Sequence, residues 1–306
     1  MHFHRFAATE YVRIAEPPSI VLQYCPACRR STRHITPFSV NGCDIRRCQG
    51  CGLGRAQTSE FDPEHYYTSD YFSGGEADGY ADYLSAETVL RNEFARTAAF
   101  IRKWHEGGRL LEIGCAYGFF LHEAKPHYDV AGIELSADAT SHCRKFGLDV
   151  VHGVANEETL SKIGAVDVIV MLDVIERLPA AHETLGLLTQ RLNPGGIIVI
   201  TTGDFSSTFA RLFGKRWRLM TPPQHLWFFS RDSVCKIAAS LQLSVEQIDH
   251  PWKIVPASLI LFQLRRMLGL RQLTRSGSHT TTGASELGLP LNLFDAMRVV
   301  LRKPAS

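Results

Sequence analysis

The chain has 306 residues, of which 45% are hydrophobic and 21% charged, and a formal net charge of +2. The length and composition are typical of a soluble globular protein with one large core and a small accessory module. The net charge is too small to suggest a protein that coats nucleic acid nonspecifically. Because no apolar run reaches the roughly 18 residues that span a bilayer, and the first twenty residues lack the apolar core of a signal peptide, we expect a cytoplasmic protein.

Two CxxC pairs lie near the N-terminus, CPAC at 25–28 and CQGC at 48–51, with nineteen residues between them. Four thiolates on two tight turns can surround one zinc ion and close its coordination shell, which makes such a site structural. The predicted ligands are Cys25, Cys28, Cys48 and Cys51. Cys43 does not fit this spacing and is expected to be a buried thiol. The sequence therefore predicts a zinc ribbon over residues 20–57.

Residues 58–108 are interpreted as an aromatic and helical linker that also caps the next domain. Tyrosines and phenylalanines cluster in EHYYTSDYF at 64–72 and continue with Tyr80 and Tyr83. A helical pattern of apolar residues then runs from Val89 to Ile101. Two roles remain open for the aromatic residues: a lid over a ligand, or packing at the junction between the domains.

The stretch RLLEIGCAYG at 109–118 predicts a strand, a tight turn and the start of a helix. The turn holds Gly114, Ala116 and Gly118, and a second apolar run ends about twenty residues later in Glu134, where an α/β fold places an acid against a ribose. A dinucleotide fingerprint would need a third glycine where Phe119 stands. The spacing therefore favours a nucleoside without phosphates, with a charged tail running past the turn.

Further strands and helices alternate regularly after this turn. Strands are predicted at 129–134, 148–153, 166–172 and 197–202, with helices between them. Residues 193–196, Asn-Pro-Gly-Gly, are a helix-end signal before the last of these strands. Apolar strands between amphipathic helices indicate a parallel sheet that is covered on both faces.

The stretch at 109–118 resembles motif I, (L/V)(D/E)(I/V)GxGxG, of class I S-adenosylmethionine-dependent methyltransferases. DVIVMLDVIERL at 167–178 resembles motif IV of the same family, and Asn-Pro-Gly-Gly before the fifth strand also matches it. The resemblance implies a Rossmann-like α/β fold with a seven-stranded, mostly parallel sheet. Two residues depart from the pattern: Ala116 replaces a glycine and restricts φ, and Arg177 replaces the usual histidine, which questions a role of that helix in proton transfer.

The resemblance also implies a set of cofactor-binding residues. Asp173 is expected beside the amino-acid tail of S-adenosylmethionine, and Val154 and Ala155 against its adenine. The full set is Glu112, Gly114, Ala116, Gly118, Glu134, Leu135, Val154, Ala155 and Asp173.

Residues 214–234 resemble the HLxxFS element that a zinc-ribbon subgroup of bacterial class I methyltransferases carries after the fifth strand. At that position His225 faces the methyl donor, so it is a candidate general base for a substrate hydroxyl. The alternative is that His225 only fixes the loop. Ser230 is expected to cap the helix that follows.

The C-terminal part completes a methyltransferase domain over residues 109–306. A sixth strand is predicted at 243–249 and an antiparallel seventh near 296–304, with an insertion at 252–293 between them. The apolar, basic segment 255–273 has three open interpretations: burial against the protein as an acceptor-site wall, a membrane-surface helix, or a dimer contact.

These features imply an S-adenosylmethionine-dependent methyltransferase that acts on a hydroxyl of a small molecule, such as a sugar, a glycan precursor or a secondary metabolite. An RNA methyltransferase that holds RNA with its ribbon is a second candidate. It is disfavoured because the net charge is weak and the ribbon has no basic stripe beyond Arg29, Arg30, Arg46 and Arg47. A non-catalytic zinc-ribbon scaffold and a nicotinamide enzyme are the remaining alternatives. The sequence carries no signature of the acceptor, the methylated atom or the oligomeric state.

Overall fold

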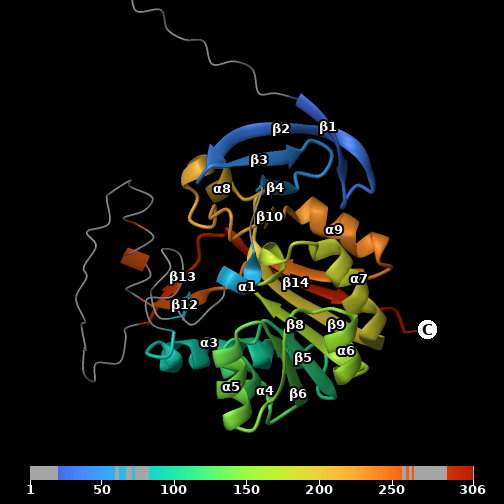
Figure 1. Ribbon diagram of the computed structural model, residues 1–306, viewed down its shortest axis with the longest axis vertical. Coiled ribbons are helices and arrows are strands. Elements are labelled where there is room, and N and C mark those ends of the chain that lie inside the picture. Colours follow the sequence, from blue (N-terminus) through green and yellow to red (C-terminus); the bar gives the residue numbers. More distant parts are fainter. Residues whose placement is uncertain are drawn as a thin grey trace, which may run out of the picture.

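A computed structural model of the protein describes residues 20–58, 62–66, 71–72, 83–256, 260–261, 264 and 288–305. Within these residues the strands form a large sheet, a smaller N-terminal sheet and a two-stranded pair (Figure 1). Helices lie on both faces of the large sheet, and the small sheet lies beyond one of its ends.

Seven described strands form the large sheet, in the order β11-β14-β9-β8-β5-β6-β7. In chain order they are β5 (Arg109–Ile113), β6 (Asp129–Glu134), β7 (Asp149–His152), β8 (Val166–Leu172), β9 (Leu192–Gly203), β11 (Ser244–Asp249) and β14 (Ala296–Arg302). Paired strands among β5 to β9 are parallel, whereas β14 runs antiparallel to β9 and β11. The predicted Rossmann-like sheet, including its antiparallel last strand, is confirmed.

Alternate residues of the central strands point into two separate hydrophobic cores. Along β8, Val168 and Val170 join one core, while Ile169 and Met171 join the other. The first core is covered by α3 (Glu87–Arg102), α4 (Phe119–Ala124) and α5 (Ala137–Lys145). The second is covered by α6 (Glu157–Ile163), α7 (Ala181–Arg191) and α9 (Arg231–Ser240). Because both faces are buried, the strands are almost continuously apolar, as the sequence indicated.

Residues 193–196 differ from the prediction. They were expected to form a turn between a helix and a strand, but α7 ends at Arg191 and β9 begins at Leu192. Leu192 is buried and pairs with Val166, and a register shift between Val166 and Val168 accommodates the extra residues. The amide of Gly195 also donates to the carbonyl of Lys303. Tertiary pairing thus draws a turn-like sequence into the strand.

The N-terminal sheet is larger than the predicted ribbon. Its strands are β1 (Ile20–Cys25), β2 (Arg30–Val40), β3 (Cys43–Cys48), β4 (Gly54–Gln57) and, from much later in the chain, β10 (Trp227–Phe228). β10 pairs with β4 in antiparallel register, Trp227 opposite Arg55 and Phe228 opposite Gly54. The stretch that resembles HLxxFS is therefore a strand of the ribbon's own sheet.

The remaining described elements are short. They are α1 (Pro63–Tyr66), η1 (Ile175–Arg177), α8 (Thr208–Phe213), η2 (Gly214–Arg216), β12 (Lys253–Pro256) and β13 (Gly288–Leu291). Tyr80 and most of the segment 255–273 lie outside the described residues. In the described part of the chain, every helix is too short or too polar to cross a bilayer.

Candidate functional site

The turn after β5 lies where the strand order changes direction, since β5 pairs with β6 on one side and β8 on the other. In open α/β sheets this is where ligands bind. Gly114, Ala116 and Gly118 have φ angles of 69°, 47° and 77°. Ala116 therefore keeps the turn, as expected, but in a left-handed conformation that costs a residue with a Cβ about 1–2 kcal/mol.

Glu134 fixes this turn from the end of β6. Its Oε2 accepts the amide of Ala116 at 2.8 Å, and its Oε1 accepts the amide of Ser136 at 2.8 Å. Burial raises the pKa of Glu134, and the hydrogen bonds from the amides partly oppose this rise. The Glu134 carboxyl is thus held in one orientation at the edge of a cavity that it lines.

A cavity of about 710 Å³ opens at the carboxyl ends of the strands, a size typical of sites for small molecules. Of the predicted cofactor residues, it is lined by Glu112, Gly114, Ala116, Glu134, Leu135, Val154, Ala155 and Asp173. Gly118 is the one predicted cofactor residue that does not line this cavity. A Cβ on Gly118 would lie 2.4 Å from Leu148 Cδ1, so Gly118 allows α4 to pack closely.

Glu112 brings an unusual buried carboxyl to the cavity wall. Its side chain is almost fully buried, and within the described residues its Oε2 has no hydrogen-bond partner. Burial, together with the neighbouring Cys143 and Glu134, raises the pKa of Glu112 well above its ordinary value. A buried polar atom at a cavity wall is costly unless a ligand or water completes its hydrogen bonding.

Asp173, directly after β8, has a lowered pKa, in contrast to Glu112. Its Oδ1 accepts the hydroxyl of Thr201 at 2.9 Å, and the ammonium of Lys253 lies 3.0 Å from its Oδ2. Desolvation alone would raise the pKa of Asp173, but Lys253, Thr201 and Arg177 outweigh it and lower the pKa to about 2. Asp173 is therefore an anion at the cavity, already paired with a cation from β12.

His225 lines the same cavity and is buried. Its Nδ1 donates to the carbonyl of Leu219 at 2.8 Å, which places the lone pair of the neutral ring on Nε2. That Nε2 lies 3.8 Å from Oε1 of Glu176, whose Oε2 accepts the hydroxyl of Thr202. The site thus contains a paired imidazole and carboxyl.

Sequence reasoning missed Glu176, although the residue stands in the motif IV stretch. Arg177 departs from the family pattern at the next position, but Glu176 itself faces His225. Burial and the nearby Asp173 raise the pKa of Glu176 to about 7. Lys253 was also missed, because nothing in its local sequence indicates that it reaches Asp173.

Arg177 itself connects the site to the aromatic cap. Its Nε donates to the carbonyl of Asp173 at 3.1 Å, and its guanidinium lies 5.7 Å from the centre of the Tyr71 ring. Tyr71, Phe72 and Tyr83 are buried, pack on one another and line the cavity. These three residues therefore cover part of the cavity and pack against Phe119 of α4 and Ala139 of α5, while packing at the junction with the ribbon stays a prediction.

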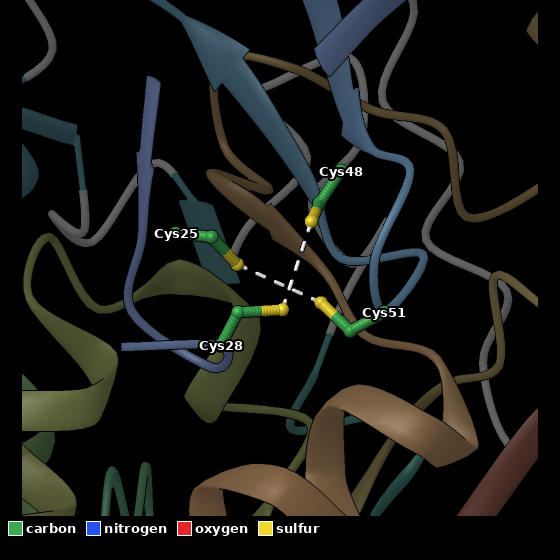
Figure 2. Close-up of side chains that lie close together, drawn as sticks. All are labelled: Cys25, Cys28, Cys48 and Cys51. Atoms are coloured by element: carbon green, nitrogen blue, oxygen red, sulfur yellow. Dashed lines mark hydrogen bonds between the residues drawn. The ribbon is translucent and has the colours of Figure 1, made fainter. Parts of the chain in front are cut away.

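The four predicted metal ligands come together at the base of the N-terminal sheet. Figure 2 shows their sulfur atoms pointing toward one another, and all four lie within 4.8 Å of one another. The separations of 3.6 Å for Cys25–Cys51 and 3.9 Å for Cys28–Cys48 are close to the roughly 3.8 Å edge of a tetrahedron with zinc–sulfur bonds of about 2.3 Å.

The surroundings of the cysteines also fit a metal. Cys48 Sγ lies 3.1 Å from the hydroxyl of Thr32 and accepts the amide of Gly50 at 3.3 Å. Hydrogen bonds of this kind stabilise thiolates and orient metal ligands. All of the chain's cysteines are unpaired thiols, and Cys43 is buried as expected.

A family model described as "Methyltransferase domain" matches residues 85–248, more than half of the chain. A ubiquinone biosynthesis O-methyltransferase of Methylococcus capsulatus is 30% identical over 41% of this chain and 54% of its own length. The enzyme of the same name from Paramagnetospirillum magneticum is 32% identical over 36% of this chain and 45% of its own length. The chain thus spans about half the length of the relatives it matches.

Among solved structures, a Bacillus halodurans protein assigned as a methyltransferase has a TM-score of 0.50 and 13% identity. The match covers 69% of this chain and 98% of that one. Identity this low shows a common fold and no more.

Proposed function

The chain belongs to the methyltransferase domain family, and from this premise we propose that it transfers a methyl group from S-adenosylmethionine to a hydroxyl of a small molecule. The observation that carries the proposal is the buried Glu134 carboxyl, held by the Ala116 amide at the edge of a cavity. The relatives named as O-methyltransferases support an oxygen acceptor.

The residues around the cavity suit an adenosyl amino acid. Glu134 offers carboxylate oxygens to ribose hydroxyls, and Val154 and Ala155 offer a surface for the adenine. Asp173 supplies an anion for the ammonium of the tail, and Glu112 has a polar atom that needs a partner. Bound here, the cofactor supplies a methyl group already activated by its sulfonium, so the protein's tasks are alignment and removal of a proton.

His225 is proposed as the general base for that proton. Its Nδ1 hydrogen bond to Leu219 orients the ring so that Nε2 accepts the proton of the acceptor hydroxyl. The imidazolium that forms is then stabilised by the Glu176 carboxylate at 3.8 Å. Glu176 also lines the cavity, and its proposed role is to act through His225 as a positioning residue.

The acceptor is proposed to be a hydroxylated small molecule with a partly apolar body. The cavity is also lined by apolar side chains that include Phe94, Ile254 and Leu291, which would cover a ring or an alkyl chain. A sugar or glycan precursor remains within this class and belongs in the same test. The cysteine cluster is proposed to hold a structural zinc, since all four positions are filled by protein thiols.

Incubation with radiolabelled S-adenosylmethionine tests the proposal. Small-molecule extract and total RNA from a bacterial lysate are offered separately, and the labelled product is then treated to distinguish oxygen-bound from nitrogen-bound methyl groups. Label in a small molecule on oxygen is expected. Label only in RNA would replace the proposal with the RNA alternative. No labelled product from either fraction would favour the scaffold alternative.

A further inference from the structure

The loop that carries His225 is continuous with the cysteine-bearing sheet. We propose that the metal-bound ribbon positions His225, so that metal occupancy governs the rate of methyl transfer and leaves the cofactor-binding half of the site intact. The predicted effect of metal on the methyl-transfer rate rests on the proposed function. The predicted ordering of the His225 loop by the metal-bound ribbon rests on the structure alone.

Leu226, the residue after His225, is held from both sides. Its amide donates to the carbonyl of Glu176 at 2.8 Å, and its own carbonyl accepts the amide of Ala56 at 2.9 Å. Ala56 lies in β4, eight residues or fewer from Cys48 and Cys51. One backbone unit therefore links the ribbon, the base and the residue that faces the base.

A second link joins the other end of the loop directly to a metal ligand. The hydroxyl of Ser230 donates to the carbonyl of Cys51 and also caps α9 by accepting the amide of Ser233. One turn further along α9, Lys236 donates to the carbonyl of Gly50 at 2.7 Å. The Cys48–Cys51 knuckle is thus bonded to the first two turns of the helix that ends the loop.

The side chains around β10 and β4 are closely packed, so these strands have little room to move relative to each other. A Cβ on Gly54 would lie 2.9 Å from the ring of Phe205 and 3.0 Å from Cβ of Phe228. The guanidinium of Arg55 lies 4.9 Å from the ring centre of Trp227, whose Nε1 donates to the carbonyl of Leu178. Cys25, Cys48 and Cys51 share one hydrophobic core with Trp227 and Phe229. A shift of β4 would therefore move β10.

The turn of the cofactor half is hydrogen-bonded to other elements, although Ile113 and Ile133 belong to the same hydrophobic core as the ribbon cysteines. Gly114 and Ala116 follow β5, Glu134 ends β6, and the hydrogen bonds of this turn run to Ile133 and Glu134. Both strands lie inside the parallel sheet, whose pairing does not involve the ribbon. Because structural zinc supplies folding free energy to small modules, its removal is expected to loosen the ribbon and β10 before this sheet.

Hydrogen–deuterium exchange of the full chain, with and without metal, tests the inference. Metal is removed by a chelator in one sample and by Cys28→Ser in another, and zinc content is measured. Cys235→Ser is the matched control, because Cys235 is an exposed thiol on α9 outside the cluster. We expect peptides covering 54–57 and 219–230 to exchange at least tenfold faster without metal, with residues 109–118 unchanged. S-adenosylmethionine affinity should stay within threefold, while kcat falls at least tenfold.

Gly54→Ala provides a test that keeps the metal. The added methyl group presses β4 away from β10, so zinc content is expected to be unchanged while exchange in 219–230 rises and kcat falls. Unchanged exchange in 219–230 after metal loss, or equal loss of cofactor affinity and kcat, would overturn the inference. Because exchange is read without turnover, a wild-type protein that transfers no methyl group would end the proposed function and leave the conformational result intact.

Discussion

The ammonium nitrogen of Lys253 lies 3.0 Å from Oδ2 of Asp173, so the anion proposed for the cofactor's ammonium already has a cationic partner. An incoming amino-acid tail must displace Lys253 or share Asp173 with it. A partly exposed ion pair of this kind contributes about 0.2–1 kcal/mol.

Lys253→Met is therefore expected to tighten S-adenosylmethionine binding by up to about fivefold, the equivalent of that ion pair. Calorimetric titration measures the change. Lys162→Met is the control, because Lys162 pairs with Glu158 on the surface of α6 and should leave the affinity unchanged. Weaker binding in Lys253→Met would mean that Lys253 holds the cofactor's carboxylate and does not compete with its ammonium.

Gly114→Ala should weaken cofactor binding through the shape of the turn. Gly114 has φ of 69°, and a Cβ there would lie 2.8 Å from Cγ2 of Val174. Gly147→Ala is the matched control, since Gly147 has φ of 72° with no atom within 4 Å of a Cβ. Both variants carry the same backbone strain, and Gly114→Ala adds the contact with Val174, so we expect a larger loss of stability in Gly114→Ala and a loss of affinity of tenfold or more in that variant alone. Equal affinities in the two variants would argue against a ligand at this turn.

His225→Ala is expected to lower kcat by about 10²–10⁴, the usual contribution of a positioned general base. S-adenosylmethionine affinity should change little, because His225 lies on the loop before β10 and not on the Glu134 edge. His122→Gln, on α4, serves as the control for histidine replacement. Equal losses of kcat and affinity in His225→Ala would assign His225 a structural role.

Glu176 gives the reaction a pH dependence. With a pKa of about 7, it becomes an anion over neutral pH, and only the anion stabilises an imidazolium at His225. We therefore expect the ratio of wild-type kcat to Glu176→Gln kcat to rise with an apparent pKa near 7, because the titration of His225 as the base is common to both proteins. A ratio that does not change with pH would assign the titration to another group.

The same group should affect stability with the opposite sign. Below its ordinary pKa of 4.5 the carboxyl is protonated whether the chain is folded or not. Between 4.5 and about 7 the unfolded chain releases the proton first, so the free energy of unfolding falls by at most about 1.4 kcal/mol per pH unit. Chemical denaturation across this window should show that fall in the wild type relative to Glu176→Gln. A constant difference between the two proteins would contradict the raised pKa.

The central sheet could be predicted from the sequence because its signals are local. Apolar runs of strand length, the small residues of the turn and the acid at Glu134 each indicate their place without reference to the rest of the chain. The spacing signals of the Cys25–Cys28 and Cys48–Cys51 pairs are equally local, and they were enough to predict that the four sulfur atoms lie together. Capping by Ser230 was predicted for the same reason and is confirmed.

The relationships that the sequence did not reveal are all between distant segments. Trp227 and Phe228 resemble any short apolar stretch, and only the fold places them beside β4. Glu176 and His225 are 49 positions apart, and their contact is supported by the hydrogen bond from the Leu226 amide to the carbonyl of Glu176. Lys253, on β12, pairs with Asp173, which follows β8. In the Asn-Pro-Gly-Gly stretch the local signal was present but lost to strand pairing.

Calorimetric titration of the wild type and Glu134→Ala with S-adenosylmethionine, and separately with NAD, tests the central claim most directly. We predict saturable binding of S-adenosylmethionine by the wild type and none of NAD. In Glu134→Ala, which loses hydrogen bonds to a charged group, the affinity should fall by about tenfold to a hundredfold, with thermal unfolding and zinc content showing a folded, metal-loaded chain. Binding of NAD, or an S-adenosylmethionine affinity unchanged by Glu134→Ala, would contradict the claim.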